Sequence, residues 1–240
     1  MASLALVRHG QASFGASDYD RLSDRGGEQA RALGVRWAAT PPAAIYSGPM
    51  RRQLDTARIA REAARAAGRE LPDVIELPGL AEMPAFELLA RCLPEVAREH
   101  VELRALVDGT AAGSARAALF DLAFWKVLDG WSRGRFELGT IEPYDAFVER
   151  VEGALGWMTA RHRQGGELIA AVTSGGPIAI AVRAVLGLAG DPTFKLWRVV
   201  RNASVTELLW RTRDGGRAGE LSLLGFNHVD HLPAELHTYR

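Results

Sequence analysis

The sequence predicts an α/β protein with a mainly parallel sheet, on three observations. Short apolar runs that suit buried strands alternate with helical segments along the first third of the chain. The first run, 3–7, ends abruptly in Arg8, His9 and Gly10, so polar side chains stand at the carboxyl end of a strand, where open α/β sheets bind ligands. A second apolar run, 167–173, also leads directly into glycines and a helical segment.

The first helix is expected to begin at Ser23, because serine is a favoured N-cap residue. Ala30, Leu33 and Trp37 share one face of this helix and are expected in the core. A pair of prolines ends the helical pattern, and a short strand is predicted next, at 44–47.

The second helix is predicted over 51–67 and is closed by a glycine. A third strand follows at 73–77, which completes an alternation of strands and helices that is typical of a parallel sheet. The apolar stripe of the second helix is expected to consist of Leu54, Ala57, Ala60 and Ala64.

The pattern changes in the middle of the chain, where helical pieces are predicted at 86–92, 95–107 and 115–128 without strand alternation. We interpret the segment at about 83–140 as a helical insertion in a single domain spanning 1–240, and as a plausible lid. Three aromatic residues in it could line a pocket or pack the insertion onto the body of the protein: Trp125, Trp131 and Phe136.

The last part of the chain returns to alternating elements. These are expected to be an amphipathic helix at 142–163, the buried strand at 167–173, a helix at 178–186, a hairpin formed by 203–211 and 220–226 around a turn at 214–216, and an irregular tail at 228–240.

The composition argues against several classes of function. The 240 residues carry a formal net charge of +0, which gives no electrostatic support for nucleic-acid binding. No apolar run approaches the length of a membrane span, and the charged Arg8 comes too early for a signal peptide. Cys92 is the single cysteine, so no intrachain disulfide can form. We therefore expect a cytoplasmic protein without a membrane or nucleic-acid partner, and a homodimer stays open.

Several segments, in this order, resemble the histidine phosphatase superfamily, which includes cofactor-dependent phosphoglycerate mutases and many small-molecule phosphatases. The resemblance covers nearly the whole chain and implies a three-layer α/β/α sandwich with a helical lid. Counting back from Thr56-Ala57 places the second phosphate-binding arginine of the family at Arg52. The matching segments are Arg8-His9-Gly10, Leu22-Ser23-Asp24-Arg25-Gly26, Ser47-Gly48-Pro49-Met50-Arg51-Arg52 and Leu80-Ala81-Glu82.

The resemblance implies a hydrolytic mechanism through a phosphohistidine. His9 would attack phosphorus, which replaces one difficult displacement by two easier ones. Arg8 and Arg52 would hold the phosphoryl oxygens, and Glu82 would protonate the leaving oxygen and later deprotonate water. The two arginines supply the positive field, so no metal and no cofactor is expected, and the expected substrate is a small phosphorylated molecule.

The family has a second histidine where this chain has Ser174, aligned on the glycine pair that follows. A neutral hydroxyl there would replace a charged donor, and losing such a donor costs about 10²–10³ in rate in other enzymes. Gly175 begins a helix, whose N-terminal N–H groups are expected to face the anion. Gln11 is also expected to contact substrate. His228 or His231 in the tail could replace the missing imidazole.

The substitution at Ser174 leaves two other functions open. The first is a catalytically impaired member of the family that binds a phosphorylated ligand or a protein. The second is a serine hydrolase, in which Ser174 is followed in the chain by Asp191 or Asp214 and then by His231. That hypothesis leaves the arginines near the N-terminus without a role.

Two further functions are less favoured. A phosphoglycerate mutase is less expected than a phosphatase, because Met83-Pro84-Ala85-Phe86 follows the acid instead of the glycine and aromatic pattern common there. A dinucleotide-binding fold is excluded, because no Gly-x-Gly-x-x-Gly follows the first strand.

Overall fold

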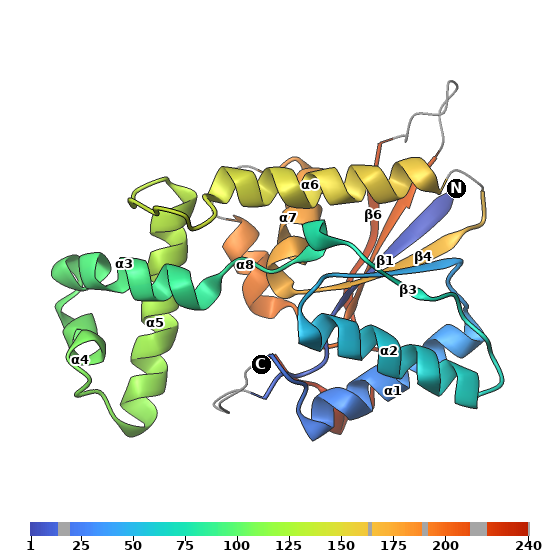
Figure 1. Cartoon of the computed structure of the whole chain (residues 1–240), viewed down its shortest axis with the longest axis horizontal. Helices are drawn as coiled ribbons and strands as arrows, with labels where there is room; N and C mark the ends of the chain where they lie inside the picture. Colours follow the sequence, from blue (N-terminus) through green and yellow to red (C-terminus); the bar gives the residue numbers. More distant parts are fainter. Residues whose placement is uncertain (14–19, 163–164, 189–191, 212–219, 240) are drawn as a thin grey trace. The chain divides into compact units, whose positions relative to one another are not determined.

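A computed structural model describes residues 1–239 except 14–19, 163–164, 189–191 and 212–219. The described elements are shown in Figure 1. They are β1 (Ala2–Arg8), α1 (Asp24–Ala39), β2 (Ala44–Ser47), α2 (Arg51–Ala66), β3 (Val74–Glu76), η1 (Pro78–Leu80), α3 (Ala85–Glu99), η2 (Val101–Leu103), α4 (Arg104–Val107), α5 (Gly113–Ser132), α6 (Tyr144–Arg161), β4 (Leu168–Thr173), α7 (Gly175–Leu186), α8 (Pro192–Val199), β5 (Val205–Trp210), β6 (Ser222–His228) and η3 (Ala234–Leu236).

The described strands form a six-stranded sheet in the order β3-β2-β4-β1-β5-β6. The strands β3, β2, β4 and β1 run parallel, whereas β5 and β6 pair antiparallel with their neighbours. This arrangement confirms the predicted α/β fold with a mainly parallel sheet. The strand β1 lies between β4 and β5, so the residues that follow it emerge at the middle of the sheet.

Side chains of β1 alternate between the two faces of the sheet, as the period of two residues in a strand requires. Leu4 and Leu6 join a core with α7 and the C-terminal half of α6. Ala5 and Val7 join a second core with α1 and α2. The sheet is therefore covered by helices on both faces, which is the three-layer sandwich that the family resemblance implies (Figure 1).

The first two helices form largely as predicted. The Ser23 hydroxyl accepts a hydrogen bond from the Gly26 N–H at 3.1 Å and caps α1. The two helices pack closely because Gly34 has no side chain: a Cβ there would lie 2.2 Å from the Ala60 carbonyl oxygen. The predicted stripe on α2 was partly wrong, since Leu54 is only half-buried. Polar residues near the helix start are buried instead, namely Arg52, Gln53 and Thr56.

The chain divides into two compact units, one formed by Met1–Glu82 with Arg150–Arg240 and the other by Met83–Glu149. In the second unit α3 runs without a break through Pro94, where the sequence predicted two pieces. An apolar face continues across the proline, and packing of that face outweighs one lost backbone hydrogen bond. Trp131 is buried in this unit and donates to the Glu142 carbonyl oxygen at 2.9 Å, so its ring packs rather than lining an open pocket.

The antiparallel pairing of β5 with β6 agrees with the predicted hairpin, while its turn at 214–216 lies outside the described residues. Sequence patterns missed α8, a short helix that precedes β5. In the part of the chain that the structure describes, no helix is both long and apolar enough to cross a membrane.

Candidate active site

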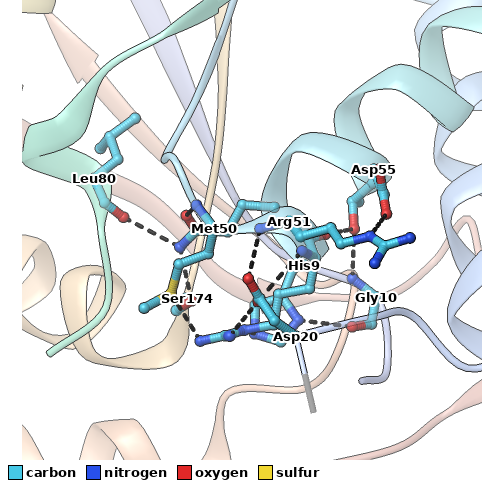
Figure 2. A network of polar contacts seen from close by, with 11 residues as sticks. His9, Gly10, Asp20, Met50, Arg51, Asp55, Leu80 and Ser174 are labelled. Atoms are coloured by element: carbon cyan, nitrogen blue, oxygen red, sulfur yellow. Dashed lines mark hydrogen bonds and ion pairs between the residues drawn. The ribbon is translucent and has the colours of Figure 1, made fainter. Parts of the chain in front are cut away.

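His9 follows β1 directly and lies beside Ser174, which follows β4. The register of the two parallel strands pairs Arg8 with Thr173, and the His9 N–H donates to the Thr173 carbonyl oxygen at 2.9 Å. His9 is 4% exposed. Figure 2 shows its ring among polar groups from several elements, with Ser174 in the same network. The carboxyl ends of neighbouring parallel strands therefore bring these two predicted site residues together.

The backbone after β1 turns tightly, and glycine is needed for that turn to pack against α1. A Cβ on Gly10 would lie 2.5 Å from the carbonyl oxygen of Gly26, and a Cβ on Gly26 would lie 2.1 Å from that of Gln11. The Gly10 N–H donates to the Thr56 hydroxyl at 3.0 Å, and that hydroxyl donates to the Arg52 carbonyl oxygen at 2.7 Å. The turn that carries His9 is thus fastened to α2.

The contacts of the His9 ring define which nitrogen can react. Its Nδ1 lies 2.7 Å from the Gly10 carbonyl oxygen, which can only accept, so Nδ1 carries the proton. Its Nε2 accepts a hydrogen bond from the Arg52 Nε–H at 3.1 Å. Burial, and then the charges of Arg52 and Arg8, hold the pKa of His9 well below 6.5, although the bond to Gly10 opposes this shift. His9 is therefore a neutral imidazole with a lone pair on Nε2.

Arg52 is 7% exposed, so the prediction of Arg52 rather than Arg51 as the inward-facing arginine agrees with the structure. Its Nη1 donates to a carboxylate that the sequence analysis missed, the Oδ1 atom of Asp20, at 2.6 Å. Asp20 also accepts from the Arg51 backbone N–H at 2.8 Å, so it occupies the N-terminus of α2 (Figure 2). Asp20 stands two positions before the segment Leu22-Ser23-Asp24-Arg25-Gly26 and belongs to none of the segments that match the family. Nothing in its local sequence pattern indicates the contact with Arg52.

Arg8 is the second arginine whose charge acts on the His9 imidazole. Its Nη1 donates to the carbonyl oxygens of Val200 and Tyr239, the latter at 2.9 Å. A Cβ on Gly175 would lie 3.9 Å from the Arg8 Nε atom. The guanidinium is therefore held between the start of α7 and two carbonyl groups from late segments of the chain.

The Glu82 carboxylate lies at the start of α7, which differs from what the sequence predicted for this helix. The Gly176 N–H, which was predicted to face an anion, donates instead to the Glu82 Oε2 atom at 3.0 Å. The carboxylate sits so close to the helix that a Cβ on Gly176 would lie 2.1 Å from Oε1. A carboxylate of the chain takes this position because a helix N-terminus stabilises any nearby negative charge.

The segment that carries Glu82 is fastened to its surroundings by backbone contacts. The Leu80 carbonyl oxygen accepts from the Thr173 hydroxyl at 2.6 Å and from the Gln53 Nε2 at 3.2 Å. Arg150 Nη1 donates to the carbonyl oxygens of Gly79 and Ala81, each at 3.0 Å. These bonds fix the loop, so the position of Glu82 does not depend on its side-chain contact alone.

The remaining predicted contact residues are held by neighbours. The Ser174 hydroxyl accepts from the Gln53 Nε2 at 2.8 Å. The Gln11 Oε1 accepts from the hydroxyl of Ser23 at 2.9 Å, so Gln11 also supports the cap of α1. Gln53, like Asp20, was missed, because a polar residue on a helix normally faces solvent.

Trp197 on α8 is a further residue at this site that the sequence did not reveal. A Cβ on Gly175 would lie 2.8 Å from its ring atom Cδ1, and one on Gly176 would lie 2.9 Å from its ring atom Cη2. The indole thus covers the start of α7 beside Glu82. Two adjacent glycines that open a helix were the available signal for such a close approach.

Among the described residues, no hydrogen bond or ion pair joins either tail histidine to His9, Arg52 or Ser174. His228 is exposed beside Asp230, with 3.7 Å between Nδ1 and Oδ2. Burial, and then the charge of Arg36 of α1, lower the pKa of His231. Ser174 has no imidazole partner among the described residues, which leaves the serine-hydrolase hypothesis without support there. The two alternatives for the acidic residue of such a hydrolase, Asp191 and Asp214, lie outside the described residues.

The sequence matches a family model, the histidine phosphatase superfamily (branch 1), over residues 4–111 and 121–219. The chain belongs to this superfamily. Within the described residues, no group of three or more His, Cys, Asp or Glu side chains could hold a metal ion.

Solved structures with the same fold include several phosphatases. Phosphoserine phosphatase from Entamoeba histolytica, in complex with 3-phosphoglyceric acid, is 22% identical with a TM-score of 0.63, covering 97% of this chain and 100% of that chain. Bacillus stearothermophilus YhfR is 22% identical with a TM-score of 0.63, covering 96% and 99%. A mycobacterial glucosyl-3-phosphoglycerate phosphatase is 21% identical with a TM-score of 0.62, covering 94% and 98%. No curated protein sequence matches the chain significantly.

Proposed function

We propose that this protein hydrolyses small phosphomonoesters through a phosphohistidine on His9. The observation that carries the proposal is the neutral imidazole, with its proton on Nδ1 and its lone pair on Nε2 beside the Arg52 guanidinium. A buried neutral imidazole flanked by two cations is a nucleophile in a field that attracts phosphate.

The chemistry takes two displacements. In the first, Nε2 of His9 bonds to phosphorus while the bond from phosphorus to the leaving oxygen breaks, and protonated Glu82 gives that oxygen its proton. In the second, water attacks phosphorus, the bond to Nε2 breaks, and Glu82 takes the proton from the water. Arg52 moves from His9 and Asp20 to the phosphoryl oxygens, and Arg8 adds positive charge.

The test is hydrolysis of p-nitrophenyl phosphate and of a panel of phosphorylated metabolites by the wild type, by His9→Ala and by the control His100→Ala. We expect turnover in the wild type and in the control, at least about 10³-fold less in His9→Ala, and acid-labile phosphate on His9 after rapid quenching. Equal turnover in His9→Ala and the wild type would contradict the proposal.

A second function, binding of a phosphorylated ligand without turnover, is favoured by one observation. The Nε2 atom of His9 already accepts from Arg52, and the oxygen of Ser174 already accepts from Gln53. This alternative predicts that inorganic phosphate binds, in isothermal calorimetry, while no phosphohistidine forms with any substrate.

A further inference from the structure

The amide of Gln53 is fully buried and its orientation is fixed by two backbone groups. Its Oε1 accepts from the Met50 N–H at 3.2 Å, and its Nε2 donates to the Leu80 carbonyl oxygen at 3.2 Å. A backbone N–H can only donate and a carbonyl oxygen can only accept, so the amide cannot be reversed without breaking both bonds. The group that faces Ser174 is therefore the NH₂ of Gln53.

The fixed amide determines what the Ser174 hydroxyl can do. The Gln53 Nε2 donates to the Ser174 Oγ at 2.8 Å, so this oxygen acts as an acceptor there and its own proton must be donated elsewhere. Ser174 is 1% exposed, and no described protein group accepts that proton. The Arg8 guanidinium, whose Nε atom would lie 3.9 Å from a Cβ on Gly175, carries only donors, and the Glu82 carboxylate accepts from the Gly176 N–H. The hydroxyl is a buried donor that awaits an acceptor.

The strand register directs this donor to the candidate site. Arg8 of β1 pairs with Thr173 of β4, so Ser174 lies beside His9 at the same edge of the sheet. Gln53 reaches Ser174 from α2, where it is next in the chain to Arg52. A phosphoryl group between His9 and Arg52 would offer the acceptor oxygen that the Ser174 hydroxyl lacks.

We propose that Gln53 is a positioning residue that orients the Ser174 hydroxyl as a hydrogen-bond donor to the phosphoryl group. The proposal rests on the proposed function for its effect on turnover, while its effect on phosphate binding can be measured without turnover. The Gln53 and Ser174 pair would then perform, with neutral groups, the stabilisation that an imidazole gives at the position where the family alignment places Ser174.

The experiment compares Gln53→Met, Gln53→Glu, Ser174→Ala and the double variant Gln53→Met with Ser174→Ala. Methionine keeps the length of glutamine but cannot donate, whereas a glutamate carboxylate accepts from the hydroxyl and turns its proton away from the site. We expect kcat for p-nitrophenyl phosphate to fall roughly 10-fold in Gln53→Met and about 10²-fold in Ser174→Ala and Gln53→Glu. Inorganic phosphate should bind more weakly in the same order.

Two readouts separate positioning from a structural role. In the Ser174→Ala background, Gln53→Met should cost little further activity, because the hydroxyl it orients is gone. The activity of Gln53→Glu should recover as the pH falls, because the protonated carboxyl group can again donate, while Gln53→Met shows no such recovery. Equal losses for Gln53→Met in both backgrounds, or an unchanged pH profile in Gln53→Glu, would overturn the proposal.

Folding is checked by thermal melting, with Thr159→Val as the control for loss of a buried polar contact, since its hydroxyl bonds only to carbonyl oxygens of α6. If Gln53→Met does not fold, Gln53→Glu and Ser174→Ala still decide the outcome. If the wild type binds phosphate but hydrolyses nothing, the proposed function fails, and the order of phosphate affinities among the variants still tests Gln53.

Discussion

The N-termini of α2 and α7 both lie at the candidate site, and a carboxylate of the chain occupies each of them. Asp20 accepts the Arg51 N–H at 2.8 Å at the start of α2, and Glu82 accepts the Gly176 N–H at 3.0 Å at the start of α7. The backbone N–H groups at a helix start suit an anion, whether a carboxylate of the chain or a phosphate. The two carboxylates differ, however, in what else holds them.

Among the described residues, Asp20 is held only by contacts of its side chain, which forms an ion pair with the buried Arg52. The Asp20 side chain is 39% exposed. Glu82 stands on a backbone segment that is fixed by hydrogen bonds to the carbonyl oxygens of Leu80 and Ala81. We infer that a phosphoryl group can displace Asp20 from Arg52, whereas Glu82 stays at α7 and acts as the acid. Similar contacts at two helix starts can thus serve opposite purposes.

The largest expected effect is that of Glu82→Gln. The amide cannot give or take the proton, so kcat should fall about 10²–10⁴-fold for an alkyl phosphate, whose leaving group needs protonation. The loss should be much smaller for p-nitrophenyl phosphate, because nitrophenolate leaves without a proton. Steady-state kinetics with both substrates measure the difference, and equal losses would show that Glu82 is not the acid.

The second test displaces the Glu82 side chain by a substitution at a neighbouring residue, while Glu82 itself is kept. In Gly176→Ala the new Cβ would lie 2.1 Å from Oε1 of Glu82 and 2.9 Å from the Trp197 ring, so one of them must shift. We expect a loss of about 1–3 kcal/mol in the free energy of unfolding and a lower kcat for alkyl phosphates. The control Gly156→Ala, whose Cβ meets nothing within 4 Å on α6, should keep full activity. If the two variants behave alike, Glu82 is not anchored at α7.

The largely buried imidazole of His231 makes the free energy of unfolding depend on pH. Burial, and then the charge of Arg36, lower the pKa of His231 to about 4, from its ordinary value of 6.5. The unfolded state binds the extra proton first as the pH falls below 6.5, so this contribution is complete above pH 6.5 and is lost toward pH 4, by about 3 kcal/mol. Urea unfolding at several pH values should show a shallower loss in His231→Gln than in the wild type. Identical slopes would contradict this assignment.

The smallest expected effect is that of Asp20→Asn. Removing the charge that competes for Arg52 should strengthen binding of inorganic phosphate by up to about 5-fold, because an ion pair whose carboxylate is 39% exposed contributes about 1 kcal/mol at most. Isothermal calorimetry at two salt concentrations measures it, and the gain should shrink at high salt. Weaker phosphate binding in Asp20→Asn would show that Asp20 supports the site instead of competing for it.

The sequence predicted the elements whose pattern is local. A serine before a helical run, a buried apolar strand and a helical face of apolar residues each follow from short-range rules, and α1, β1 and β4 formed accordingly. The contact between His9 and Arg52 was expected from the family resemblance, because the segments that carry these two residues have fixed places in the family's fold. The sequence analysis did not predict that α3 continues through Pro94. Packing of the apolar helix face stabilises the helix there, although proline on its own favours a break.

The parts of the site that could not be predicted depend on contacts between distant segments. Asp20 reaches Arg52 across 32 positions of the chain, and Gln53 reaches Ser174 across 121. Neither residue has a distinctive neighbour pattern, and burial of a glutamine on a helix runs against its average preference. Only the folded position of α2, relative to the segment before α1 and to the residue that follows β4, makes these side chains partners.

The bond from Arg8 to the carbonyl oxygen of Tyr239 has a consequence for biosynthesis. These residues are 231 positions apart. At a ribosomal speed of about 5–20 residues per second, roughly 10–50 s pass between the synthesis of Arg8 and that of its partner. The Arg8 guanidinium therefore makes this contact only after Tyr239 has been synthesised, so the nascent chain carries His9 long before it carries the complete candidate site.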